Sequence, residues 1–230
     1  MLYLKQHHYV PDRNDAAIIN KVAHSQFDVA QEILTKPGAL IFPESLTENL
    51  NPALYQKLKA MNGSMVGAAE TIFPNGMPDN FEELSAVQTE FIAELGASKT
   101  LFFLGEVDHV QRSMDPKVSQ QIDAEIQQLQ KQYGPDLEVM VEYDPKLRYL
   151  IFEARENELY KEVQETTKKP ENAGKPVVVI FGGAHDLGRG LSAENGFNLR
   201  VKDLSGAADH STPEADGLAG HGQLDRPKKK

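Results

Sequence analysis

The sequence predicts a three-layer α/β fold with a mostly parallel central sheet flanked by helices. Short apolar runs recur along the chain, stretches of helical periodicity separate them, and glycine or proline stands at most junctions. The clearest run begins at Val177 and stops at Gly182, and its unbroken apolar character is typical of a strand buried on both faces. We expect one domain over residues 1–204 and a disordered tail over residues 205–230, because the tail has few apolar residues.

The first third of the chain predicts two strands, two helices and a loop. Alternating or continuous apolar residues indicate the strands, and apolar residues three or four apart indicate the helices. Proline and glycine at 37 and 38 end the first helix. The expected elements are, in order, a strand over Leu2–His8, a helix over Asp15–Leu34, a strand over Ala39–Phe42, a helix over Pro52–Ala60 and a loop from Asn62 to about Asp79.

The middle of the chain predicts two helices on either side of a strand. Asn80 and Glu83 have the spacing of a capping box, which predicts a helix ending at Gly96. The apolar run Thr100–Leu104 predicts a third strand, stopped by Gly105. Asp115 and the following proline predict the start of a helix that Gly134 ends.

The last part of the chain holds one ambiguous segment. Leu137–Tyr143 alternates like a strand. Tyr149–Phe152 also fits a strand, but the surrounding spacing favours a single long helix over Leu147–Lys169. After the strand at 177–182 we expect a short helical turn near Leu191 and a final strand over Phe197–Leu204.

Charge and cysteine content exclude several kinds of site. The net charge is -10, with 34 acidic against 24 basic residues, which disfavours nucleic acid as a partner because phosphate binding needs a basic surface. The absence of cysteine excludes disulfides, thiolate metal sites and a cysteine nucleophile. We therefore expect a small-molecule or peptide substrate, and the sequence leaves the oligomeric state open.

No run of residues approaches the roughly 18 apolar residues of a membrane span. The first residues lack a basic stretch followed by a long apolar one, so they do not resemble a signal peptide. These features favour a cytoplasmic location. Secretion is the alternative, since a signal peptide removed before residue 1 would leave this same sequence.

Four predicted strands end in side chains that can do chemistry. They are followed by His7 and His8, by Glu44, by Glu106 and by His185. Because the carboxyl ends of parallel strands share one edge, we expect these ends to surround one crevice. Neighbouring strand residues point to opposite faces, so only one of the two adjacent histidines can enter it.

Each of these residues also has a plainer interpretation. Glu44 fits a helix N-cap, and a histidine after two glycines fits a turn exposed to solvent. Asp108 and His109 fit ordinary loop residues. Asp186 either orients His185 or caps the next turn.

Two histidines with one or two carboxylates form a donor set for a divalent transition metal. Such a metal lowers the pKa of bound water from about 15.7 toward 7 and polarises a carbonyl. A serine nucleophile at Ser45 is less favoured, because the chain has no Gly-x-Ser-x-Gly motif. The glycines at 182–183 and 188–190 only superficially resemble a phosphate-binding loop.

The order of these motifs resembles the TraB/GumN/Tiki superfamily, with its ChaN-like and erythromycin-esterase-like relatives. The similar segments are Tyr3–Pro11 with His8 at the histidine position, Leu40–Glu44, Leu104–Gln111, the arginine segment Glu153–Glu158, and Gly182–Gly188. Lys5 stands where the first motif has glycine, and Glu156 separates the arginine from the asparagine.

The resemblance implies a metal-dependent hydrolase acting on a peptide or other acyl bond. His8, Glu44 and His185 are the expected ligands of manganese, cobalt or zinc, and Glu106 is the expected general base or fourth ligand. Arg155 is expected to stabilise an anionic intermediate or to pair with a carboxylate of the site. The alternative is a non-catalytic protein that binds a ligand such as haem, as ChaN-like members do. In either case, the glycines at 182 and 183 are the expected cofactor contact.

Overall fold

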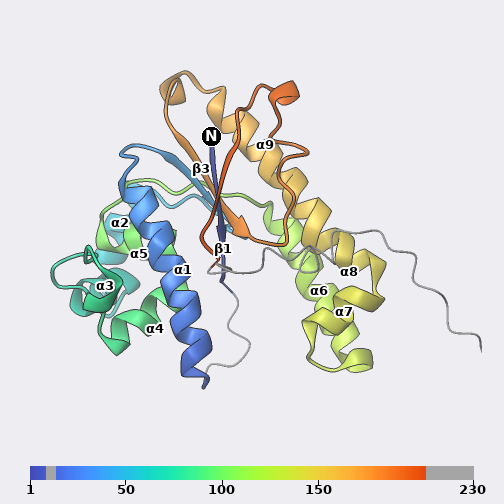
Figure 1. Cartoon of the computed structure of the whole chain (residues 1–230), viewed down its shortest axis with the longest axis horizontal. Coiled ribbons are helices and arrows are strands. Elements are labelled where there is room, and N and C mark those ends of the chain that lie inside the picture. Colours follow the sequence, from blue (N-terminus) through green and yellow to red (C-terminus); the bar gives the residue numbers. More distant parts are fainter. Residues whose placement is uncertain (9–13, 206–230) are drawn as a thin grey trace, which may run out of the picture.

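The computed structural model describes residues 1–8 and 14–205 (Figure 1). Its α-helices and strands, in chain order, are β1 (Leu2–Gln6), α1 (Ala16–Leu34), β2 (Leu40–Pro43), α2 (Pro52–Lys59), α3 (Met65–Ile72), α4 (Ala86–Leu95), α5 (Ala97–Leu104), α6 (Pro116–Tyr133), α7 (Leu137–Tyr143), α8 (Pro145–Tyr149), α9 (Arg155–Thr167), β3 (Val177–Gly182) and β4 (Arg200–Asp203). A π-helical segment, Leu150–Ala154, joins α8 to α9. Short 3-10 turns are Phe81–Glu83, Pro170–Asn172 and Ala193–Asn195.

The described strands form one parallel sheet in the order β2-β3-β1-β4. The register pairs Gln6 of β1 with Gly182 of β3, and Pro43 of β2 with Ile180 of β3. The carboxyl ends of β1, β2 and β3 therefore lie at one edge of the sheet. This arrangement confirms the predicted α/β fold with a parallel sheet between helices.

Alternate strand residues pack against different helices, which gives the three layers. In Figure 1, α1 to α5 lie to the left of the sheet and α9 lies to its right. The residues that face α1, α4 and α5 are Leu4, Ile41, Val178 and Ile180. The residues that pack with Leu159 and Val163 of α9 are Tyr3, Leu40, Phe42, Val179 and Phe181.

Helices α6, α7 and α8 form a helical lobe at the lower right of Figure 1. The lobe has its own small apolar cluster, made of Leu129, Met140 and Leu147. Lys146 pairs with Glu125, which is almost buried, so the lobe is also held by an ion pair. The apolar cluster of the lobe is separate from the two apolar clusters that pack on the sheet.

The predicted strand at Thr100–Leu104 is wrong, since this segment lies in α5. Six of the eight residues of α5 are buried, so its sequence shows no apolar stripe and cannot be told from a buried strand by periodicity. Tertiary burial here overrides the β preference of the segment.

The predicted strand at Leu137–Tyr143 is also wrong, and this segment is α7. Asp136 accepts a hydrogen bond from the Val139 backbone N–H at 3.3 Å, which is a helix-starting contact. Met140 is buried against Leu129 of α6. Packing inside the helical lobe therefore decides this segment rather than its alternating pattern.

Smaller differences concern helix starts and element ends. The capping box lies at Ser85 and Gln88, not at Asn80 and Glu83, and the expected loop before it contains α3. The last strand covers only Arg200–Asp203. The predicted helical turn near Leu191 is confirmed, since the Leu191 backbone N–H donates to the Leu187 carbonyl at 3.0 Å, and the 3-10 turn Ala193–Asn195 follows it. The long helix predicted from Leu147 is confirmed, with the π-helical segment inside it.

Within the described ranges, no helix combines the length and apolar character that a bilayer crossing requires. Of the predicted tail, only Ser205 falls inside the described residues.

Candidate active site

The carboxylate of Glu44 is the centre of the candidate site. Glu44 follows β2, and its side chain is only 5% exposed. Its Oε2 accepts a hydrogen bond from the Gly182 backbone N–H at 2.6 Å, and its Oε1 accepts one from Arg155 Nη2 at 2.5 Å. His185 Nε2 lies 3.3 Å from Oε1, and His8 Nδ1 lies 3.6 Å from Oε2. The structure thus brings together four of the predicted site residues and Gly182.

Glu44 is held in its ionised form. Burial by itself would raise the pKa of this carboxyl group, but the hydrogen bond from His185 and the charge of Arg155 outweigh burial. The pKa of Glu44 consequently lies well below its usual range. Since α2 is capped by Asn51, Glu44 is not the helix N-cap that the sequence also allowed.

His185 lies between two carboxylates. Its Nε2 faces Glu44, its Nδ1 lies 3.0 Å from Glu156 Oε1, and its side chain is 4% exposed. Burial would lower the pKa of His185, but the hydrogen bonds to Glu156 and Glu44 raise it above its usual value. The rings of Phe152 and Phe181 pack against the imidazole at 5.4 and 5.2 Å between centroids. Two carboxylates, one on each ring nitrogen, favour the positively charged imidazolium form of His185.

Glu156 is a site residue that the sequence analysis did not assign. Besides His185, it accepts a hydrogen bond from the Asp186 backbone N–H at 3.3 Å. Asp186 itself caps the next turn, through Gly188 N–H at 3.1 Å, so it does not orient the histidine. The only hint in the sequence was that a glutamate stands between the arginine and the asparagine of the resembling motif.

The π-helical segment directly precedes Arg155 and Glu156. Successive residues of a helix point about 100° apart. The two side chains accordingly reach different partners, with Arg155 on Glu44 and Glu156 on His185. π-helical turns inside α-helices are frequent at functional sites.

His8 occupies the exposed side of the site. Its side chain is 45% exposed, in contrast to the nearly buried Glu44 beside it. A Cβ at Gly182 would lie 2.9 Å from His8 Cε1, so only glycine at 182 leaves room for this ring. Gly183 has open space around it and is exposed. Of the two adjacent histidines, His8 is the one that contacts Glu44, in line with the expected alternation of side chains.

Ser45 follows Glu44 in a strained conformation. Its φ is 65°, and it is the one non-glycine residue with positive φ among the residues described. Strain of this kind is concentrated at functional sites. Arg155 Nη2 donates a hydrogen bond to its exposed hydroxyl. Ser45 therefore belongs to the site, although its partner is a guanidinium group rather than a base.

The structure does not bring Glu106 to these residues. Glu106 Oε1 accepts a hydrogen bond from the Met77 backbone N–H at 2.8 Å, in the loop after α3. The physical reason is that Thr100–Leu104 is a helix, so Glu106 does not follow a strand of the sheet. Asp108 and His109 follow the same helix and are exposed.

As they lie, these side chains do not fit a divalent cation. Both nitrogens of His185 face carboxylates, and Oε1 of Glu44 is bonded to the Arg155 guanidinium. Over residues 1–8 and 14–205, no three or more His, Asp and Glu side chains are grouped as metal ligands would be. The prediction of manganese, cobalt or zinc on His8, Glu44 and His185 has no support from this arrangement.

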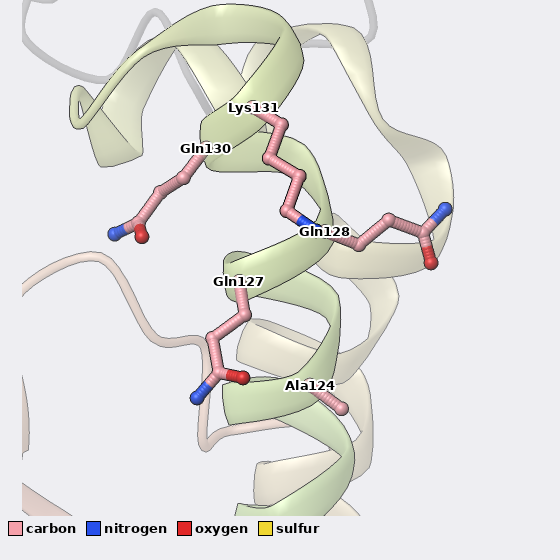
Figure 2. Close-up of a pocket in the computed structure, with 5 residues that line it drawn as sticks. All are labelled: Ala124, Gln127, Gln128, Gln130 and Lys131. Atoms are coloured by element: carbon pink, nitrogen blue, oxygen red, sulfur yellow. The ribbon is translucent and has the colours of Figure 1, made fainter.

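Two hollows of the described surface are lined by other residues. One, with a volume of about 680 Å³, lies on the outer face of α6 and is lined by Ala124, Gln127, Gln128, Gln130 and Lys131. Figure 2 shows these side chains. The other, of about 700 Å³, is lined by Gly188, Leu191, Ser192, Ala193, Gly196, Phe197, Asn198 and Leu199. Neither lining contains a histidine or a carboxylate, so neither offers the acid–base chemistry of the sheet edge.

Comparison of the chain with protein-family models, with curated proteins and with solved structures finds no match.

Proposed function

We propose that the chain is a hydrolase of a peptide or other acyl bond, with His8 as its general base. The supporting observation is a half-exposed imidazole beside a buried carboxylate that stays ionised. His8 Nδ1 lies 3.6 Å from Glu44 Oε2, and the two side chains are 45% and 5% exposed. A histidine oriented by a carboxylate is the arrangement that activates water or a hydroxyl group in many hydrolases.

In this proposal a water molecule on the exposed side of His8 attacks the acyl carbon. The Nε2 atom of His8 takes the proton of the water, and the charge of Glu44 stabilises the imidazolium that forms. The proton then passes to the leaving nitrogen or oxygen as the acyl bond breaks. The 3.6 Å separation is longer than a hydrogen bond, and such contacts often shorten only when substrate is bound.

Arg155 supplies positive charge at the same edge. Its side chain is 13% exposed, and it donates hydrogen bonds to both Glu44 and Ser45. We assign to Arg155, acting through the exposed Ser45 hydroxyl, the stabilisation of the anionic intermediate. Pairing with a carboxylate and stabilising an anion, the two expected roles of Arg155, are thus compatible in one geometry.

The test is a panel of fluorogenic peptides and aryl esters, measured on the wild type, His8→Ala and His7→Ala. Removing the general base lowers kcat/KM by about 10²- to 10⁴-fold. His7→Ala is the matched control, because His7 is the adjacent residue of the same type and should leave kcat/KM within about threefold of wild type. Equal activity of wild type and His8→Ala, or no turnover on the whole panel, counts against the proposal.

The same panel tests the metal prediction. Because two of the three predicted ligands, Glu44 and His185, are already engaged by Arg155 and Glu156, we expect dialysis against a chelator to leave turnover unchanged. Activity that is lost with chelator and restored by manganese, cobalt or zinc would instead favour a metal-dependent hydrolase. Elemental analysis of the purified protein shows whether the metal is bound to the protein or is only present in the assay buffer.

Haem binding is the second candidate, and one observation favours it. The half-exposed imidazole of His8 has the accessibility that an axial ligand of haem iron needs. The measurement is an absorbance titration with haem. A shift of the Soret band that disappears in His8→Ala but not in His7→Ala would support this candidate, and an unshifted band would eliminate it.

A further inference from the structure

His7 lies one residue beyond the end of the β1–β3 ladder, yet both of its backbone groups are bonded. The last paired residues of that ladder are Gln6 and Gly182. The His7 backbone N–H donates to Ser25 Oγ at 2.8 Å, and its carbonyl accepts from Gln26 Nε2 at 2.8 Å. Two side chains of α1 therefore take the place of a neighbouring strand at the residue before His8.

The Gln26 amide has little freedom to turn. Its Nε2 also donates to Gln6 Oε1 at 3.0 Å, and its Oε1 accepts from the Ala97 backbone N–H at 2.9 Å. Ala97 begins α5, where the N-cap is a glycine with no side chain to offer, so Gln26 also caps that helix. Ser25 and Gln26 are each 1% exposed. A buried amide with its donors and acceptor all used fixes the geometry of everything it touches.

The His8 ring has little room to move without losing its contacts. Its ring lies over the Gly182 backbone, where a Cβ would be 2.9 Å from Cε1 and 3.4 Å from Nδ1. The same ring must keep Nδ1 directed at Glu44 Oε2. A displacement of about 1 Å in a reacting group can cost up to 10²-fold in rate.

We infer that Ser25 and Gln26 are positioning residues that hold the backbone at His7 so that the His8 imidazole stays over Gly182 and beside Glu44. This inference rests on the proposed function of His8. Ser25 and Gln26 lie in the middle of α1, far in sequence from any strand. The inference gives them a role in the reaction at the sheet edge. Both residues are buried, so we expect them to act on His8 and not on the substrate.

The experiment compares four single variants of the full chain. Ser25→Ala and Gln26→Met remove the bonds to His7. Ser25→Thr keeps a hydroxyl at the same position. Gln31→Met is the matched control, because Gln31 is on the same helix and donates to a backbone carbonyl, that of Pro78 at 2.8 Å. All four are measured at a temperature where each is fully folded by circular dichroism.

The first readout does not depend on turnover. In the nuclear Overhauser spectrum of wild type we expect a contact between His8 Hε1 and the Gly182 α-hydrogen, assigned by its loss in His8→Ala. The contact should weaken at least about threefold in Ser25→Ala and Gln26→Met, and persist in Ser25→Thr and Gln31→Met. An unchanged contact in both Ser25→Ala and Gln26→Met overturns the inference.

The second readout separates positioning from general stability. We expect kcat to fall about 10- to 100-fold in Ser25→Ala and Gln26→Met, with KM changed less than about threefold. Equal losses of kcat in Gln31→Met would show that destabilising α1 suffices, and would overturn the inference. A weakened contact at His8 in a protein that turns over nothing supports the positioning role and counts only against the proposed hydrolase.

Discussion

The two histidines at the sheet edge approach the same carboxylate from environments that differ strongly. His185 is 4% exposed, and both of its nitrogens face carboxylates. His8 is 45% exposed, and its contact with Glu44 is longer, at 3.6 Å. The buried half of the edge, made of Glu44, Arg155, Glu156 and His185, is a charge-balanced cluster. The exposed half, at His8, keeps a ring that solvent can reach, as the proposed role of general base requires. One carboxylate thus contacts the buried histidine through Oε1 and the accessible one through Oε2.

Among the substitutions that test this difference between the two halves, Glu44→Gln is expected to lower the free energy of unfolding most. In glutamine one of the two carboxylate oxygens is replaced by an NH₂ group. In the variant this group would face the N–H donor of either Gly182 or Arg155, and that donor would lose its acceptor. Breaking a buried ion pair in this way costs about 3–5 kcal/mol in the free energy of unfolding. Urea unfolding measures it. The control is Glu70→Gln in the exposed pair with Lys59, for which the expected loss is under about 1 kcal/mol. Similar losses for both would refute the comparison.

The next effect is that of His185→Ala. Removing this ring leaves Glu44 and Glu156 without a shared cation and opens space beside Phe152 and Phe181. We expect a loss of about 3 kcal/mol in the free energy of unfolding. The control is His24→Ala, since His24 is exposed and its ring stacks on Phe81 at 3.8 Å; there the loss should stay under about 1 kcal/mol. A loss for His185→Ala as small as that of the control contradicts the structural role given to this ring.

A change of pH perturbs the same cluster without removing atoms, so its effect should be smaller. The lowered pKa of Glu44 stabilises the fold above the ordinary carboxyl value of 4.5, and this stability is lost as pH falls toward the folded pKa. The raised pKa of His185 stabilises the fold below the ordinary value of 6.5, and this stability is lost as pH rises through the folded pKa. These two groups together favour maximal stability between about 4.5 and 6.5.

Urea midpoints measured from pH 3 to pH 9 test this window. Since other carboxylates also titrate in acid, the informative quantity is the difference between wild type and variant. The decline toward acid should be shallower in Glu44→Gln, and the decline above pH 6.5 should be shallower in His185→Ala. Parallel curves for wild type and both variants would contradict the assignment.

The smallest effect is expected for His8→Ala. Because this ring is half exposed and makes one long contact, its removal should change the free energy of unfolding by no more than about 0.5 kcal/mol. Gln127→Ala, on the polar outer face of α6 (Figure 2), should behave alike and is the control for a surface position. A loss of 2 kcal/mol or more in His8→Ala would place His8 with the buried half and end the distinction between the two histidines.

The sequence predicted the convergence at the sheet edge from local patterns. The runs before Glu44 and His185, and the strand before His8, are apolar enough to mark buried parallel strands, and parallel strands end at one edge. The prediction was wrong for the strand before Glu106, because a helix buried on most sides has no visible period. That single error placed Glu106 in a site it does not reach.

Other site features depend on contacts that no local pattern encodes. Glu156 reaches His185 across 29 positions of the sequence, and Gln26 reaches Ala97 across 71. The sequence analysis predicted only a long helix where the π-helical segment precedes Arg155. The partners of these side chains are fixed when the layers come together.

By itself, the sequence located β1, β2 and β3 and the reactive residues that follow them, because strands buried on both faces are apolar runs. Similar local patterns also predicted strands at two segments that are helices, since periodicity does not separate a buried strand from a buried helix. Only the tertiary structure decided which histidine is enclosed and which is accessible, because the burial of a polar ring depends on the helices packed over it. It also decided that Glu44 faces Arg155 and His185, since the pairing of buried charges is fixed by distances between segments that are far apart in the chain.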